Sequence, residues 1–125
     1  MTRNAPRISD SELQILQMLW NESPLGATEL ADRLPAGRDW TLATVKTLLS
    51  RLLTKGAITA EAEGRRYRYR PEIDRDSVAS RQAQGLLDRL FGGRVSPLVA
   101  QLAEQQQITP DDLAELEALI RSLRK

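Results

Sequence analysis

One segment, TLATVKTLLSRLLTK at residues 41–55, constrains the fold of this chain more than any other. Its apolar residues recur at i, i+3, i+4, i+7 and i+8, which is the repeat of one face of an α-helix. These residues are Val45, Leu48, Leu49, Leu52 and Leu53. The spacing predicts a short amphipathic helix docked on a core, with Thr41 as its N-cap and Gly56 as the residue that ends it.

The opposite face of the predicted helix carries hydroxyl and cationic side chains. Its members, including those on its margins, are Thr44, Lys46, Thr47, Ser50, Arg51 and Lys55. Such side chains bond phosphates and base edges in a DNA groove. An ordinary surface helix with a solvated face has the same composition, so the helix alone leaves both interpretations open.

The next segment, AITAEAEGRRYRYRP at residues 57–71, predicts a β-hairpin. Glu63-Gly64 supplies the turn, and arginine then alternates with tyrosine, which is the signature of a strand. We expect Tyr67 and Tyr69 on one side of this strand and its arginines on the other. A helix followed by an arginine-rich hairpin is typical of a winged helix-turn-helix, in which the helix enters the major groove and the hairpin contacts the DNA beside it.

The charges of the hairpin again allow two interpretations. In a solvated hairpin the arginines would pair with Glu61 and Glu63, whereas in a DNA-binding hairpin they would meet phosphates. The distribution of charge favours DNA, because residues 41–70 hold seven basic and two acidic residues, a net of +5. Residues 72–125 hold seven basic and nine acidic residues, a net of −2, and the whole chain has a net of +1. We therefore predict DNA contacts for Arg65, Arg66 and Arg68.

Two further helices are predicted upstream. Ser9 is placed as an N-cap with Glu12 as its capping-box partner, and a broad apolar face follows. A turn at Asn21–Gly26 separates this helix from a second one over Ala27–Leu34. Three helices and a hairpin within residues 1–71 match the size of a winged helix-turn-helix domain, in a mostly α fold with a small β-hairpin.

The composition excludes most catalytic chemistry. The chain has no cysteine and no histidine, so neither a Ser-His nor a Cys-His nucleophile pair exists, and a transition-metal site would depend on carboxylates alone. Asp111-Asp112 directly follows Thr109-Pro110, which is how a helix begins, because a threonine N-cap, a proline at N1 and first-turn acids all stabilise a helix start. We expect no enzyme activity, no cofactor and no metal.

The sequence also bears on location. No run reaches the roughly 18 apolar residues that a membrane span requires. The N-terminal MTRNAPRIS has no apolar core of the kind found in secretory signals. Together with the absence of cysteine, these features predict a cytoplasmic protein without membrane insertion.

Residues 72–125 predict helices only. Gly92-Gly93 ends the first of them, Ser96-Pro97 begins the second, and Thr109-Pro110 begins the third. Helices this short, with so few aromatic residues, bury too little surface to fold alone.

We expect this C-terminal region to form a two-fold dimer with a second copy of the chain. The alternative is that it folds back on the winged domain of its own chain. A dimer would place two recognition helices about 34 Å apart, which suits a palindromic site. The predicted interface residues are Leu86, Leu90, Phe91, Leu98, Val99, Leu102, Leu113, Leu116, Ile120 and Leu123, of which the last four form a seam with coiled-coil-like spacing.

Four segments of the chain resemble the BlaI/MecI/CopY family of bacterial repressors, also called the penicillinase-repressor family. They are Ile8–Trp20 (ISDSELQILQMLW), Trp40–Gly56 (WTLATVKTLLSRLLTKG), Glu63–Pro71 (EGRRYRYRP) and Leu90–Val99 (LFGGRVSPLV). They occur in the family's order and spacing. The resemblance implies an N-terminal winged helix-turn-helix, a C-terminal helical dimerisation region over 72–125, and repression by occupying a dyad operator in a promoter, often the repressor's own.

The resemblance also implies where DNA contacts lie. By position, the family's contacts fall on Thr44, Lys46, Thr47, Arg51, Arg65 and Arg66. This set agrees with the polar face of the predicted helix, except that Lys46 lies at the edge of that face.

The inducing signal is where the resemblance is incomplete. Family members that answer β-lactams are inactivated by cleavage of an Asn-Phe bond, and the matching position here is Gln101-Leu102. Copper-responsive members carry a cysteine-rich metal motif, which this chain lacks. Our leading hypothesis is therefore release by a partner protease, such as a membrane sensor acting as antirepressor, that cuts at a different bond.

Two other functions remain open at this point. A winged helix can bind a protein partner instead of DNA, since fold does not fix function. The chain can also be a DNA- or RNA-binding protein with little sequence preference, whose binding would weaken with salt alike for every sequence.

Overall fold

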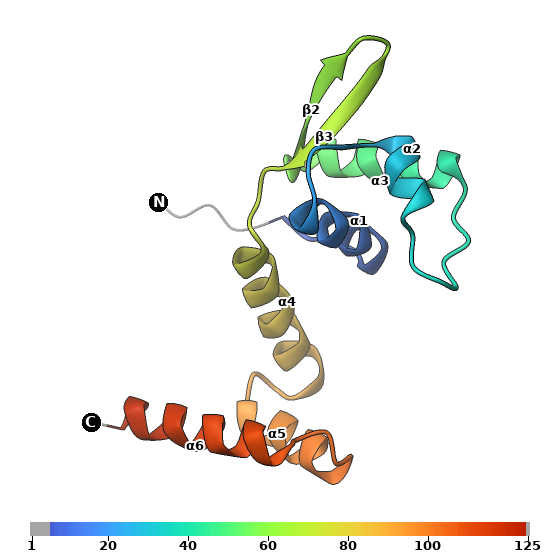
Figure 1. The fold of residues 1–125 in the computed structure, drawn as a ribbon. Coiled ribbons are helices and arrows are strands. Elements are labelled where there is room, and N and C mark those ends of the chain that lie inside the picture. The colour runs from blue at the N-terminus through green and yellow to red at the C-terminus, as the bar shows by residue number, and fades with distance from the viewer. Residues whose placement is uncertain (1–5, 125) are drawn as a thin grey trace. The chain divides into compact units, whose positions relative to one another are not determined.

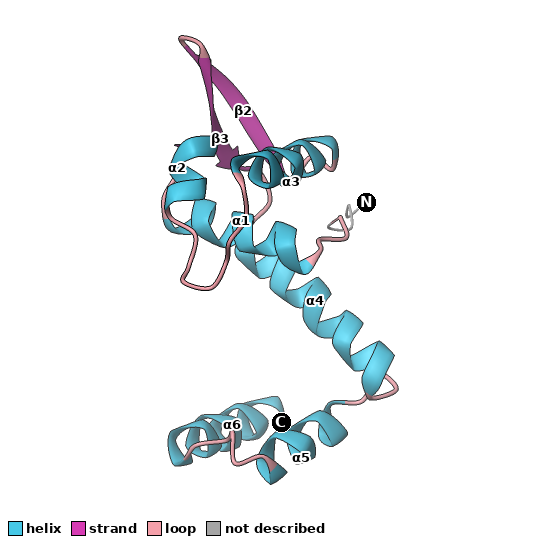
Figure 2. Cartoon of the chain, turned by 90° about the vertical axis from the view of Figure 1, so that its right-hand side faces the viewer, coloured by secondary structure: helices cyan, strands magenta, loops and turns pink. Residues whose placement is uncertain are grey.

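The computed structural model describes residues 6–124, and the chain divides into two compact units with the boundary between Arg81 and Gln82. The fold is mostly helical with one small antiparallel sheet, as predicted (Figure 1). Figure 2 shows the same elements coloured by type. In chain order they are α1 (Asp10–Asn21), β1 (Leu25–Gly26), α2 (Ala27–Asp32), α3 (Leu42–Thr54), β2 (Ile58–Glu63), β3 (Arg66–Pro71), α4 (Arg75–Leu90), α5 (Val95–Glu104) and α6 (Pro110–Leu123).

Helix α1 begins with the predicted capping box. The backbone N–H of Glu12 donates to Ser9 Oγ at 3.1 Å, and the backbone N–H of Ser9 donates to Glu12 Oε1 at 2.8 Å. Two otherwise unpaired backbone donors are thereby satisfied at the helix start. The apolar face that follows is fully buried at Ile15, Leu16 and Leu19.

Helix α3 also has the predicted ends. Thr41 Oγ1 accepts from the backbone N–H of Thr44 at 3.2 Å. At the other end Gly56 has a φ of +75°, and its N–H donates to the Leu53 carbonyl, while the N–H of Ala57 donates to the Leu52 carbonyl at 2.9 Å. This is a Schellman motif, in which a left-handed glycine turns the chain out of the helix. It leads the chain directly into β2.

The apolar face of α3 is narrower than predicted. Val45, Leu48, Leu49 and Leu52 are buried, whereas Leu53 is 38% exposed. At about 100° per residue, Leu53 lies about 80° around the helix from Val45, on the rim of the buried arc. Leu53 therefore shares the predicted apolar side of the helix but does not belong to its buried part.

The hairpin of β2 and β3 forms the predicted wing. The two strands pair from Ile58↔Pro71 at the base to Glu63↔Arg66 at the tip, and Gly64 takes a φ of +63° in the turn. A third strand was not predicted. Strand β1, which lies within the segment expected to be a turn, pairs with β3 in the order β1-β3-β2. Two residues are too few to show the alternation by which a strand is recognised in sequence.

The core of the first unit lies between α1, α2 and α3 and extends to the first turns of α4. Leu30 of α2 is fully buried, and α2 ends at Asp32, short of the predicted Leu34. Trp20 donates from Nε1 to the Ile73 carbonyl at 3.0 Å, and Val78 of α4 is buried. The compact unit therefore continues past Pro71, and the functional division of the chain at that residue stays a prediction.

An ion pair between Glu12 and Lys55 joins the start of α1 to the end of α3. Glu12 is only 1% exposed, and its Oε1 accepts from Lys55 Nζ at 2.5 Å. Burial by itself would raise the pKa of this carboxyl group, but the hydrogen bonds from Lys55 and Ser9 outweigh it and hold the pKa below 4.5. Lys55 Nζ also donates to the Arg7 carbonyl at 2.7 Å. The ammonium group of Lys55 is thus bonded to two groups within the protein.

The second unit has little core of its own. Helices α5 and α6 contain no buried residue. Gly92 and Gly93 end α4 with positive φ angles, as predicted, and α5 begins at Val95, just before the predicted Ser96. Helix α6 has the predicted Thr109 cap, with a capping box to Asp112.

We predict that Lys55→Met lowers the free energy of unfolding by about 1–3 kcal/mol at pH 7, because it leaves the buried Glu12 carboxylate without its cation. The folded pKa of Glu12 lies below its unfolded value. The contribution of the pair is therefore present above that unfolded value and is lost as pH falls through the folded pKa. Urea unfolding followed by circular dichroism should show the two proteins converging in stability at acid pH. Equal stability at pH 7 would contradict this role.

Candidate nucleic-acid interface

The polar face of α3 points away from the core. Thr44, Lys46, Thr47, Ser50 and Arg51 are all exposed, whereas the apolar face of the same helix is buried. The Thr47 hydroxyl donates to the Ala43 carbonyl at 3.0 Å, which leaves its oxygen able to accept another hydrogen bond. The helix therefore presents hydroxyl groups between two cations along one accessible side.

The wing presents two more cations. Arg65 lies in the turn between β2 and β3, and Arg66 is the first residue of β3. Both side chains are exposed. Within residues 6–124, the side chains of Lys46, Arg51, Arg65 and Arg66 have no hydrogen bond or ion pair. Four cations without a counter-charge are the arrangement expected of a surface that meets a polyanion.

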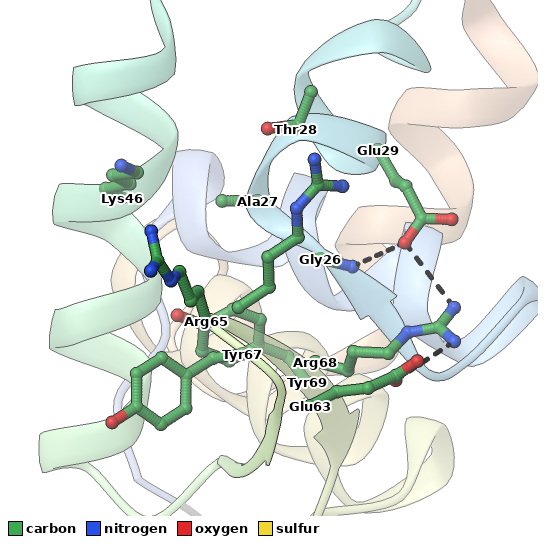
Figure 3. Close-up of a pocket in the computed structure, with 11 residues that line it drawn as sticks. Gly26, Ala27, Thr28, Glu29, Lys46, Glu63, Arg65, Tyr67, Arg68 and Tyr69 are labelled. Carbon is green, nitrogen blue, oxygen red and sulfur yellow. Dashed lines mark hydrogen bonds and ion pairs between the residues drawn. The ribbon is translucent and has the colours of Figure 1, made fainter.

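Three of these cations line one cleft of about 480 Å³, which we call the wing cleft. It lies between α3, the first residues of α2 and the wing, and Figure 3 shows the side chains that surround it. Lys46 enters it from α3, while Arg65 and Arg66 enter it from the wing. The cleft brings together residues from parts of the sequence that no local pattern connects.

The remaining arginines of the wing are engaged within the protein. Arg68 Nη2 donates to the Pro24 carbonyl at 2.9 Å and lies 3.4 Å from Glu29 Oε1, while its Nη1 lies 3.5 Å from Glu63 Oε2. Arg70 Nε lies 3.5 Å from Glu61 Oε2. Arg68 and Arg70 therefore match the interpretation in which arginines of the hairpin pair with acidic residues of the protein. Arg65 and Arg66, at the tip, match the interpretation in which arginines of the hairpin face DNA.

Two of the residues predicted to contact DNA have partners within the protein. Lys55 was placed on the DNA-facing side of its helix, but it is bonded to Glu12 and to the Arg7 carbonyl. Arg68 was placed with the other wing arginines, but its guanidinium is turned toward β1 and α2. We assign both to contacts within the protein. The other predicted residues are exposed and available.

Seven of the eleven residues that line the cleft were not among the predicted DNA contacts, and Glu29 and Glu63 are two of the seven. Thr28 lies near the start of α2, and Tyr67, which is 58% exposed, was expected on the side of the wing opposite the arginines. Tyr69 also lines the cleft, and its partial burial, with the neighbouring Tyr67, raises the pKa of its phenol. The alternation of tyrosine and arginine indicated the strand correctly. The alternation did not indicate how the strand twists toward α3. No feature of the sequence pointed to Thr28 as a residue of the site.

In residues 6–124, no helix combines the length and the apolar character that a membrane crossing needs. The same residues contain no group of three or more acidic side chains arranged to hold a metal ion.

The chain is similar to known proteins over most of its length. The sequence profile of the family described as penicillinase repressor matches residues 8–122. The penicillinase repressor of Bacillus licheniformis is 29% identical over 118 residues, which are 94% of this chain and 92% of that protein.

Two solved structures resemble the first part of the chain. One is the solution structure of the DNA-binding domain of the repressor BlaI, with a TM-score of 0.53 and 34% identity. The other is Bacillus licheniformis BlaI in monomeric form, in complex with the blaP half-operator, with a TM-score of 0.51 and 34% identity. Each comparison covers 61% of this chain and 93% of the solved chain.

Proposed function

The chain belongs to the penicillinase repressor family, and from this membership we propose that it represses transcription as a homodimer bound to a dyad operator in a promoter. The observation that carries the proposal is a set of four cations on α3 and the wing of a winged helix-turn-helix, which have no ion-pair partner in the described part of the chain. The related repressor BlaI was solved in complex with a half-operator, and this complex supports double-stranded DNA as the ligand.

The proposed docking follows from the two exposed surfaces. Helix α3 enters the major groove, where its hydroxyls and Arg51 reach base edges. Arg65 and Arg66 at the tip of the wing bind the phosphate backbone or the adjacent minor groove. Lys46, at the edge of α3 and in the wing cleft, binds a phosphate between the two surfaces. Base contacts then select the sequence, and phosphate contacts fix the orientation.

The dimer is proposed from the second unit. Its predicted seam is exposed in the single chain, with Leu113 at 51%, Ile120 at 50% and Leu123 at 76% exposure, while Leu116 is half-buried. Apolar residues at helical spacing on the surface of short helices indicate a surface that is covered in the assembly. The contact of a relative with a half-operator supports a two-fold complex with two half-sites.

Release from DNA is proposed to occur by proteolysis of the C-terminal region by an antirepressor protease. Gln101 and Leu102, which stand where related repressors have the Asn-Phe bond that is cut, both lie within α5, and the proposed cut is at a different bond of this region. A helical segment must unfold locally before it is cut, and α5 has no buried residue to oppose this opening. Immunoblots of induced cells would test the route, and an intact repressor while the target promoter is active would overturn it.

The function is tested by fluorescence anisotropy of the protein with DNA from upstream of its own gene and with a scrambled duplex, across a salt series. We expect the native duplex to be preferred by about 4–10 kcal/mol and to stay bound at physiological salt. Equal, salt-labile binding to both duplexes would contradict sequence-specific repression at that site. Absence of binding to either would favour a winged helix that binds a protein.

We predict that Arg51→Ala weakens operator binding by about 1–3 kcal/mol and relaxes the preference at one base position. Competition with operator variants substituted one base pair at a time measures this. Arg33→Ala is the matched control, because Arg33 is an exposed arginine of the same unit that already pairs with Glu22. An equal loss of affinity for every sequence would show that Arg51 contacts phosphate instead of a base.

We predict that Leu116→Asp yields monomers with poor operator affinity, because the substitution would bury a charge in the dimer seam. Sedimentation at micromolar concentration measures the oligomeric state, and Glu117→Asp at the next, exposed position serves as control. A Leu116→Asp protein that remains dimeric at that concentration would remove α6 from the interface.

A further inference from the structure

The wing cleft has two sides of opposite charge. Lys46 and Arg65 lie on one side, and the carboxylates of Glu29 and Glu63 lie on the other (Figure 3). Arg66 also lines the cleft, and these three cations have no partners among residues 6–124. A DNA phosphate that approaches the three cations would therefore also approach two acidic side chains. Carboxylates here should oppose DNA binding unless another group neutralises them.

Arg68 is placed to neutralise both. Its Nη2 lies 3.4 Å from Glu29 Oε1, and its Nη1 lies 3.5 Å from Glu63 Oε2. Its Nη2 also donates to the Pro24 carbonyl at 2.9 Å, and its side chain is only 33% exposed. The guanidinium is held there although its Nε is buried without a hydrogen-bond partner. The side chain is therefore directed into the protein, between the two carboxylates.

Glu29 is fixed from a second direction. Its Oε1 accepts from the backbone N–H of Gly26 at 2.9 Å, which ties it to the junction between β1 and α2. A β-carbon at Gly26 would lie 3.3 Å from the Tyr67 carbonyl, so the backbones of this junction and of β3 are in close contact. Arg68 thus draws the carboxylates toward a rigid junction and away from the cations across the cleft.

We propose that Arg68 is a positioning residue for DNA binding, which acts by holding and neutralising Glu29 and Glu63 so that Lys46 and Arg66 stay free for phosphates. The inference rests on the proposed DNA-binding function and adds to it. Without Arg68, the released carboxylates pair with the remaining cations of the cleft and compete with the DNA. Arg68 itself makes no contact with DNA.

A positioning role for Arg68 and direct binding of Arg68 to a DNA phosphate predict different results. If Arg68 binds a phosphate, its loss lowers affinity and reduces the slope of log affinity against log salt by about one, whatever happens to the carboxylates. If Arg68 acts through the carboxylates, removing their charges as well restores both affinity and slope. The two cases are separated by a variant that lacks all three charges.

The experiment uses the full chain with the native and scrambled duplexes described above. Arg68→Met should weaken binding of the native duplex about tenfold, because each freed carboxylate competes through an exposed ion pair worth roughly a fewfold. Adding Glu29→Gln and Glu63→Gln should return affinity to within about threefold of the wild type, with the wild-type salt slope. Glutamine at position 29 keeps an oxygen that accepts from the Gly26 N–H.

Two controls use the same wing. Arg70→Met removes an arginine that pairs with Glu61 and does not line the cleft, and should leave affinity unchanged. Arg66→Met removes a proposed contact, and its loss of affinity should not be recovered by the two glutamine substitutions. Thermal unfolding checks that each variant is folded. If the triple variant is unstable, Arg68→Met with Glu63→Gln alone, at an exposed site, should give partial recovery.

Each result has a defined meaning. Recovery in the triple variant, with an unchanged slope, supports the role of Arg68. A wild type that prefers the native duplex, with a triple variant that stays weak and has a reduced slope, overturns this inference and leaves the proposed function intact. An Arg68→Met protein that binds as well as the wild type also overturns it. A wild type that binds neither duplex overturns both.

Discussion

The ion pair between Glu12 and Lys55 fixes the position of α3, on which the DNA-facing surface depends. Glu12 serves both as capping-box partner at the start of α1 and as acceptor for a lysine at the end of α3. The charge at this buried position is tolerated because cationic and backbone donors surround it. Directly after Lys55, the left-handed Gly56 turns the chain into β2. The direction of the wing is thus set at the point where the pair anchors the helix.

The seven cations of residues 41–70 fall into two classes by their partners. Lys55, Arg68 and Arg70 have carboxylate partners, and each stabilises a junction between elements. Lys46 and Arg51, with the two arginines at the wing tip, have none within residues 6–124. An unpaired cation keeps its full field and can exchange its counterions for a phosphate, whereas a paired one must first lose its carboxylate. The proposed interface therefore uses fewer charges than the composition indicates.

Local signals in the sequence predicted the elements, but not which distant residues meet. The capping box at Ser9, the N-cap at Thr109 and the glycine stop at Gly56 are confirmed, because each depends on neighbours within one turn. Lys55 and Arg68 bind partners 43 and 39 residues away in sequence, which no local pattern indicated. Periodicity assigns a side chain to a face, and it does not say whether a carboxylate from another element lies opposite. The sequence thus indicated which surface forms the candidate site. Which of its cations pair with carboxylates could be seen only in the tertiary structure.

The small number of free cations bears on why a dimer suits the proposed function. At about 0.9 counterion per phosphate contact, the three cations proposed to bind phosphates give a salt slope of roughly −3, so a single chain would lose about fortyfold in affinity between 50 and 200 mM salt. One domain alone would therefore hold its half-site weakly at physiological salt. Two linked domains multiply their affinities, because the second binds at a high effective concentration. The exposed apolar seam of α6 and the modest charge of α3 and the wing are both consistent with the proposed dimer. If the second unit holds the dimer together, its cleavage would lower the affinity for DNA by removing this effective concentration.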